Sequence, residues 1–313
     1  MKNTILTFCC ILLQQSLFAE NKDWLIDGSP YKTEVNLSSD KKQIELTNGL
    51  LRRSFSLTPN GATIALDNLM TGQNELRAVR PEAVLVINGK EYPVGGLEGQ
   101  PVHNFLTKDF LSGMQLCDSA FVLAGYTVSE TKERFPWKPN EAWISNRYPW
   151  PVPGKRITFT YRAPRKIVDE CKGLTIRIVY ELYDGAPILS KWIEIENNGQ
   201  KAVTLDSFKS EVLALVETAP KVHYGEPHEV RMMAQKTGYY TEDYRKRPVQ
   251  TDAPRDYIDR FTQLFVVTDY AMGGDMEAMK DNPAVRWVFD HPEYEFTGIR
   301  YYGQYKPARL EVT

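Results

Sequence analysis

The sequence has few of the residues that most readily build metal and redox centres. Its 313 residues include four histidines and four cysteines, and two of the cysteines lie in an apolar N-terminal segment. The remaining pair, Cys117 and Cys171, suits either one disulfide in an oxidising compartment or two thiols. His223 and His228 are the histidines closest in sequence, and their spacing matches no common zinc template. We therefore expect neither a metal ion nor another cofactor.

An excess of charge of one sign is also missing. Lys and Arg number 38 against 40 Asp and Glu, which gives a formal net charge of -2. This balance supplies no positive field that would gather a polyanion. After the N-terminal segment, no apolar run approaches the roughly 18 residues that a membrane helix needs. We therefore expect neither a nucleic-acid partner nor a membrane span.

Sequence signatures of several enzyme classes are absent as well. The chain has no serine nucleophile elbow, no Walker loop and no dinucleotide fingerprint. The Gly-rich segment Gly95 to Gly99 is followed by Gln100-Pro101, where a phosphate site would need a helix. Glycoside hydrolysis requires two carboxylates that face each other, and a count of Asp and Glu cannot identify such a pair. The sequence therefore assigns no catalytic residue.

The N-terminus is typical of a secretory signal. Lys2 supplies the positive end, Thr4 to Leu13 form a short apolar run, and Leu17 to Ala19 offer a small residue for cleavage. A buried N-terminal helix is the alternative interpretation. We expect residues 1–19 to be a signal peptide and residues 20–313 to be exported, either to a periplasm or out of the cell.

The remaining composition favours strands. Seventeen Tyr, thirteen Phe and six Trp accompany frequent Gly and Pro, and aromatic residues are enriched in strands joined by turns. Apolar residues alternate through Leu51 to Leu57, and a turn at Thr58 to Gly61 then leads into the apolar run Ala62 to Leu69, which predicts a hairpin. Asn88-Gly89 separates two further strand-like runs and predicts a second hairpin.

The clearest strand pair lies between residues 174 and 199. Alternate apolar residues from Leu174 to Leu182 share one face, Asp184 to Pro187 reverse the chain, and the return strand carries Ile193 and Ile195 on its apolar face. We expect each strand to have one wet face. Further strands are predicted at Ile157–Tyr161, Phe261–Thr268 and Val285–Phe289, while only Asp275–Met279 suggests a helical turn. The predicted fold class is all-β, with two large packed antiparallel sheets in one domain.

Two aromatic stretches break the strand pattern and are predicted to be long loops, Phe135 to Lys155 and Gly238 to Arg260. Sugars present apolar C–H faces that lie on aromatic rings, and hydroxyls that need planar polar partners, and both loops supply these groups. Alternatively, the Trp rings seal one end of the sandwich, or the Tyr-rich loop contacts another subunit. The candidate carbohydrate-binding residues are Trp137, Trp143, Arg147, Trp150, Tyr239 and Tyr240.

Three segments together resemble a known family. Ile44 to Phe55, Thr63 to Leu69, and Val179 to Pro187 with the Trp192 strand that follows are similar to the N-terminal region of melibiase-like glycoside hydrolases, family 36 and relatives. The resemblance implies a galactose-mutarotase-like β-supersandwich, placed before a catalytic (β/α)8 barrel that carries both catalytic aspartates. It also implies a retaining α-galactosidase-like parent enzyme. No catalytic residue of that family carries over onto this sequence.

The resemblance and the aromatic loops together predict a function. We expect a non-catalytic β-sandwich of an exported α-galactosidase-like glycoside hydrolase that binds an oligosaccharide or glycoside. Its other expected partners are a second copy of the chain and a catalytic barrel, which we expect to be missing because we expect the sequence to be a truncated piece of a longer enzyme. A free-standing carbohydrate-binding module is one alternative. A sugar epimerase is another, based on His291-Pro292 followed by Tyr294 and Phe296.

Overall fold

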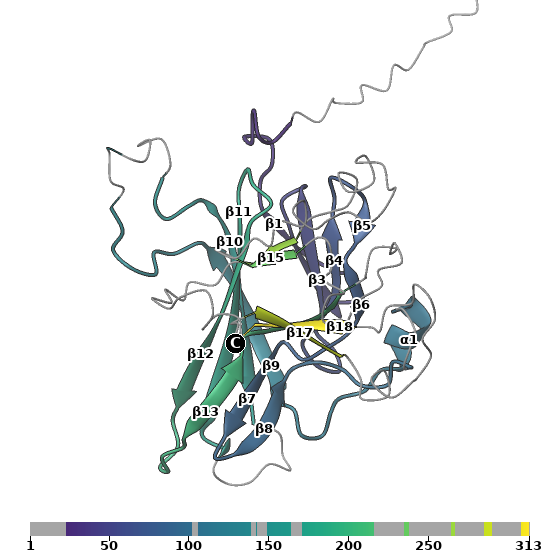
Figure 1. Ribbon diagram of the computed structural model, residues 1–313, viewed down its shortest axis with the longest axis vertical. Helices are drawn as coiled ribbons and strands as arrows, with labels where there is room; N and C mark the ends of the chain where they lie inside the picture. The colour runs from purple at the N-terminus through teal and green to yellow at the C-terminus, as the bar shows by residue number, and fades with distance from the viewer. Residues whose placement is uncertain are drawn as a thin grey trace, which may run out of the picture.

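The protein is all-β (Figure 1). The computed structural model describes residues 23–101, 106–138, 142, 149–163, 171–215, 235–237, 264–266, 285–289 and 308–312. These residues form eighteen strands and one short helix. The all-β class predicted from the sequence is therefore confirmed.

The strands form several hydrogen-bonded sheets, in some of which strands distant in sequence are neighbours. The five-stranded sheet has the order β1 (Glu34–Leu37), β2 (Gln43–Thr47), β3 (Leu51–Ser56), β4 (Ala62–Asn68) and β5 (Gln73–Asn74). One four-stranded sheet has the order β12 (Leu189–Asn197), β11 (Leu174–Tyr183), β10 (Gly154–Arg162) and β9 (Val122–Glu130). The three-stranded sheet has the order β13 (Leu205–Lys209), β7 (Ala83–Ile87) and β8 (Lys90–Val94).

Two further sheets include strands from the C-terminal third of the chain. The second four-stranded sheet has the order β17 (Val285–Phe289), β18 (Ala308–Val312), β14 (Glu211–Leu215) and β6 (Leu76–Ala78). The strands β15 (Gln235–Thr237) and β16 (Leu264–Val266) form a parallel pair, whereas all the other strand pairs in the described part of the chain are antiparallel. β16 and β17 fall on two of the strands predicted from the sequence.

The three predicted hairpins are confirmed. In the first, β3 pairs with β4 and Ser56 lies opposite Ala62. In the second, Ile87 of β7 lies opposite Lys90 of β8. The two turn residues, Asn88 and Gly89, have φ values of 50° and 74°, as a type I′ turn requires. In the third, β11 pairs with β12 over nine residue pairs.

Two local predictions need correction. The helix α1 (Lys108–Gly113) was not predicted. It is too short to show a helical period, and its start is stabilised by Thr107 Oγ1, which accepts a hydrogen bond from the N–H of Phe110 at 3.3 Å. The loop predicted to end at Lys155 ends at Pro153, because β10 begins at Gly154. The predicted turn at 275–279 lies outside the described residues.

One apolar core joins three of the sheets. Side chains from β2 and β3, from β7 and β8, and from β10 and β11 form a continuous buried cluster. Figure 1 shows the sheet of β1–β5 and the sheet of β9–β12 on opposite sides of the molecule. The Phe55 ring of β3 lies 4.8 Å from Phe159 of β10 and 4.9 Å from Tyr180 of β11, measured between centroids. Aromatic contacts therefore connect the two layers.

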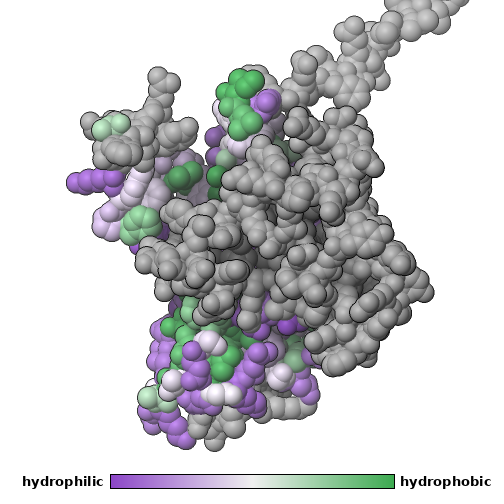
Figure 2. Space-filling model, viewed as in Figure 1, coloured by the Kyte–Doolittle hydropathy of each residue, from purple (hydrophilic) through white to green (hydrophobic). Residues whose placement is uncertain are grey.

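The expected wet faces of β11 and β12 differ from the structure. On β11, the second face is buried too, because Thr175, Val179 and Glu181 are only 1–2% exposed. Arg156 and the segment after β9 cover Glu181. On β12, Ile195 points to the core side yet is 39% exposed, because β12 is an edge strand. Figure 2 shows apolar surface bordered by hydrophilic residues in the lower part of the molecule, where β12 and β13 lie.

A buried ionic cluster lies at the centre of the sandwich. Arg53 extends from β3 and is 2% exposed. Its guanidinium forms two hydrogen bonds with the Glu211 carboxylate, at 2.6 and 3.2 Å, and lies 3.6 Å from Glu82. The Lys191 ammonium donates to Glu211 at 2.6 Å and to the Glu82 carbonyl at 2.5 Å. Each charge in this cluster therefore faces an opposite charge, as burial requires.

The same cluster links the four larger sheets. Arg53 belongs to β3, Lys191 to β12 and Glu211 to β14, while Glu82 immediately precedes β7. The Tyr180 hydroxyl of β11 donates to Glu82, and the Arg53 guanidinium lies 4.6 Å above the Tyr180 ring. Burial raises the pKa of Glu211, but the charges of Arg53 and Lys191 outweigh it and lower the pKa to about 2. Glu211 therefore stays ionised into strong acid.

The two cysteines among the described residues, Cys117 and Cys171, are thiols in the structure. Cys171 is buried, and Cys117 is half-buried with its Sγ 3.1 Å from Ser119 Oγ. Of the two arrangements that the sequence allows, the structure contains the pair of thiols. The fold is therefore stabilised by packing and by the ionic cluster.

The depressed pKa of Glu211 predicts acid-dependent stability. A carboxylate whose pKa is lower in the folded state stabilises the fold above its ordinary pKa, and this contribution is lost as the pH falls towards about 2. The free energy of unfolding should fall by about 3 kcal/mol between pH 5 and pH 2 because of this group. Urea unfolding across this range should show a shallower pH dependence for Glu211→Gln, whereas the exposed control Glu34→Gln should match the wild type. An unchanged slope in Glu211→Gln would contradict the assignment.

Two glycines with positive φ should respond differently to substitution. Gly95 and Gly89 have φ values of 64° and 74°, so both substitutions strain the backbone. A Cβ at Gly95 would overlap the carbonyl oxygen of Gly61, whereas a Cβ at Gly89 would meet no atom within 4 Å. Gly89→Ala should cost about 1 kcal/mol of stability, and Gly95→Ala about 3 kcal/mol or more. Equal losses in denaturant unfolding would show that the overlap is relieved without cost.

Candidate functional site

The segment between β9 and β10 forms two arms beside the β9–β12 sheet (Figure 1). The described parts are residues 131–138 and 149–153, together with residue 142. The arms meet at their base, where Thr131 Oγ1 donates to the Val152 carbonyl at 2.6 Å and the Thr131 N–H donates to the Gly154 carbonyl at 3.3 Å. Neither arm continues a strand, as the five prolines of this stretch predict.

An aromatic cluster joins the two arms, and we define it as Phe135, Trp137 and Trp150. The Trp150 ring lies 5.3 Å from Phe135 and 5.2 Å from Trp137 between centroids, with interplanar angles of 45° and 56°. The Trp150 Nε1–H donates to the Glu133 carboxylate at 3.1 Å. Two of the predicted binding residues, Trp137 and Trp150, are therefore in direct contact.

The aromatic cluster lies at the surface. Phe135 is 48% exposed, and Trp137 and Trp150 are half-buried. Phe135 and Trp137 both pack on Trp150, and the three rings belong to none of the buried apolar clusters of the sandwich. This arrangement leaves aromatic surface available beside a carboxylate.

A third indole lies next to the first arm. Trp192 of β12 is half-buried, and its Nε1–H donates to Glu194 at 3.0 Å. The guanidinium of Arg134 lies 4.7 Å from the centre of the Trp192 ring, and that of Arg156 lies 5.1 Å from it. Trp192 was not among the residues predicted to bind a ligand. The sequence signal that could have found Trp192 is a Trp among the polar residues of the return strand.

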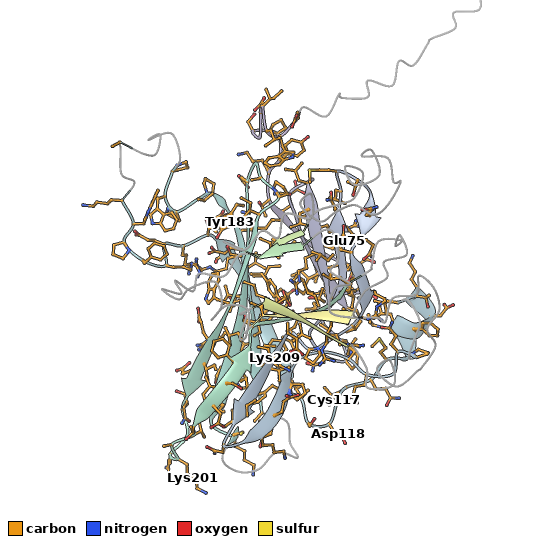
Figure 3. The ribbon with its side chains drawn as sticks, in the orientation of Figure 1. Glu75, Cys117, Asp118, Tyr183, Lys201 and Lys209 are labelled. Atoms are coloured by element: carbon orange, nitrogen blue, oxygen red, sulfur yellow. The ribbon has the colours of Figure 1, made fainter. Side chains whose placement is uncertain are left out.

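Below the arms, polar side chains of the sheet form a connected group. The Tyr183 hydroxyl lies 3.1 Å from Glu181 and 3.0 Å from Ser190 Oγ, and burial raises the pKa of Tyr183. Figure 3 shows Tyr183 at the end of β11 that faces the loop. Arg156 of β10 binds the same Glu181 carboxylate at 2.6 Å. These groups fix the sheet surface on which the first arm lies.

The arrangement suits binding more than bond cleavage. Aromatic faces can stack on apolar faces of a ligand, and Glu133 can accept hydrogen bonds from hydroxyl groups. The buried carboxylates Glu82 and Glu211 lie near each other around Arg53, but both are held in ion pairs at the centre of the core. Within the described ranges, no group of three or more His, Cys, Asp and Glu side chains is placed to hold a metal ion.

The remaining predicted site residues cannot be compared with the structure. Trp143, Arg147, Tyr239 and Tyr240 lie outside the described residues. The four histidines also lie outside them, including His291, on which the epimerase alternative depends. In the portion of the chain that is described, no helix is both long and apolar enough to span a membrane.

Comparisons with models of protein families, with characterised proteins and with solved structures found no match to this chain. The function therefore has to be argued from the geometry of the arms and from the sequence.

The contact between Trp137 and Trp150 should produce a spectroscopic signal. Indoles this close couple their electronic transitions, which gives a paired positive and negative band in circular dichroism. Trp137→Phe and Trp150→Phe should each abolish the same band pair. Trp24→Phe should preserve it, because Trp24 takes part in neither ring contact of the aromatic cluster. Survival of the band pair in either loop variant would rule out the contact.

Proposed function

We propose that this chain is the carbohydrate-binding β-sandwich of an exported α-galactosidase-like glycoside hydrolase. In this proposal the aromatic cluster binds an oligosaccharide or glycoside, and the bond is cleaved by groups on another domain or chain. The galactose-mutarotase-like supersandwich and a periplasmic or secreted location belong to the same proposal.

The observation that carries the proposal is the pairing of Trp137 and Trp150 beside Glu133 at the protein surface. Burying an aromatic ring in a sandwich contributes to stability, whereas leaving three of them in contact at a surface keeps apolar area exposed to water. Stacking of a sugar C–H face would remove that area from water, and Glu133 would accept hydrogen bonds from its hydroxyl groups.

The fold supports the proposal in a second way. The three segments that resemble melibiase-like hydrolases form β2–β3, β4 and the β11–β12 hairpin. The β2–β3 and β11–β12 segments contribute to one core and to its ionic cluster, and Thr63 of β4 accepts a hydrogen bond from Arg53 of that cluster. The resemblance therefore concerns parts of the chain that pack together, which favours a shared architecture over a chance match of separate strands.

Retention on an immobilised galactoside tests the proposal. Trp137→Ala and Trp150→Ala should each weaken binding by roughly threefold to tenfold, because each removes one aromatic contact. The matched control Trp24→Ala should bind as the wild type does. Retention that is unchanged in both loop variants would assign the rings to packing alone. Equal retention on a matrix without sugar would show that the rings bind apolar surface in general.

A further inference from the structure

The first arm, residues 131–137, uses its two sides for different contacts. Side chains at the odd positions Thr131, Glu133, Phe135 and Trp137 contact the second arm. The side chain at the even position 134 instead contacts β12 through Trp192. The chain bends at Arg134 and Phe135, and these contacts place the arm as a strip between the second arm and the sheet.

A single ion pair on the sheet binds the backbone of this strip at Lys132. The Lys132 N–H donates to Glu181 Oε1 at 3.3 Å, and the Lys132 carbonyl accepts from Arg156 Nη2 at 3.3 Å. Arg156 in turn binds Glu181 Oε1, through Nε at 2.7 Å and through Nη2 at 2.6 Å. Both polar groups of one residue's backbone are therefore satisfied by one pair of side chains.

The ion pair is itself held in place. Arg156 and Glu181 lie directly opposite each other on the paired strands β10 and β11. Their side chains are 15% and 3% exposed, and the Tyr183 hydroxyl lies 3.1 Å from the second oxygen of Glu181. A buried, hydrogen-bonded pair in strand register has little freedom to move. It can therefore fix the position of anything bound to it.

We propose that Arg156 and Glu181 are positioning residues for the aromatic cluster. By binding the backbone of Lys132 they hold the first arm against the sheet, and the side chains that follow, Glu133, Phe135 and Trp137, then meet Trp150. The consequence for carbohydrate binding rests on the proposed function, whereas the consequence for the geometry of the rings does not.

The test uses Arg156→Lys. Lysine keeps the charge opposite Glu181 but lacks the planar fork that reaches the Lys132 carbonyl at the same time. The circular dichroism band pair from Trp137 and Trp150 should weaken, and retention on the galactoside matrix should fall by about threefold or more. Arg177→Lys is the matched control, because Arg177 of β11 binds Glu196 at 2.6 Å on the same face of the same sheet. It should leave both signals unchanged.

Lys132→Pro provides an independent variant should Arg156→Lys fail to fold. Proline lacks the backbone N–H that donates a hydrogen bond to Glu181. The substitution leaves the ion pair between Arg156 and Glu181 intact, and residue 132 is exposed. A folded variant with a weakened band pair supports the proposal. A band pair of wild-type strength in folded Arg156→Lys, or in Lys132→Pro, overturns it. Loss of the band pair, in a protein whose wild type does not bind the galactoside, supports the positioning role and refutes the proposed function.

Discussion

A positive charge at the centre of an apolar core is the constraint on which the rest of this structure depends. Arg53 cannot reach water from β3, so its charge has to be balanced inside the protein. Glu211, Glu82, Lys191 and Tyr180 converge on it from four other segments. Removing one partner from a buried group of this kind leaves an uncompensated charge, at a cost of about 3 to 5 kcal/mol. The sheets therefore have to pack in an arrangement that also balances these buried charges.

The outer face of the β9–β12 sheet also carries a pair of opposite charges that balance each other. Arg156 and Glu181 are paired by strand register, and the pair has hydrogen-bonding capacity left for the backbone of Lys132. The arms between β9 and β10 contain many prolines and make no strand ladder of their own in the described residues. They gain order from this anchor, from the contacts at Thr131 and from the stacked rings. A rigid sheet thus supports a surface of aromatic groups, which is the arrangement that a binding site for a neutral, hydroxyl-rich ligand needs.

Much of the fold could be predicted because its signals are local. Asn88-Gly89 specifies a tight turn through backbone conformations that few other residues adopt, and the apolar alternation of β11 specifies its inward face. The helix at Lys108–Gly113 has no such signal, since six residues are too few to show a period. The burial of Glu181 was also beyond local reasoning, because the residues that cover it, Arg156 and the arm at Lys132, are distant in sequence.

For the candidate site too, some features could be predicted from the local sequence and others could not. Aromatic and proline composition by itself predicted that residues 135–155 would leave the strand pattern and carry Trp137 and Trp150, since ring structure and the missing N–H of proline are properties of single residues. Only the tertiary structure decided that these two rings touch, that Arg134 lies over the Trp192 ring, and that Arg53 is buried rather than solvated. Contacts between distant segments depend on how whole sheets pack, because burial and charge pairing are satisfied by the assembled fold and by no segment alone.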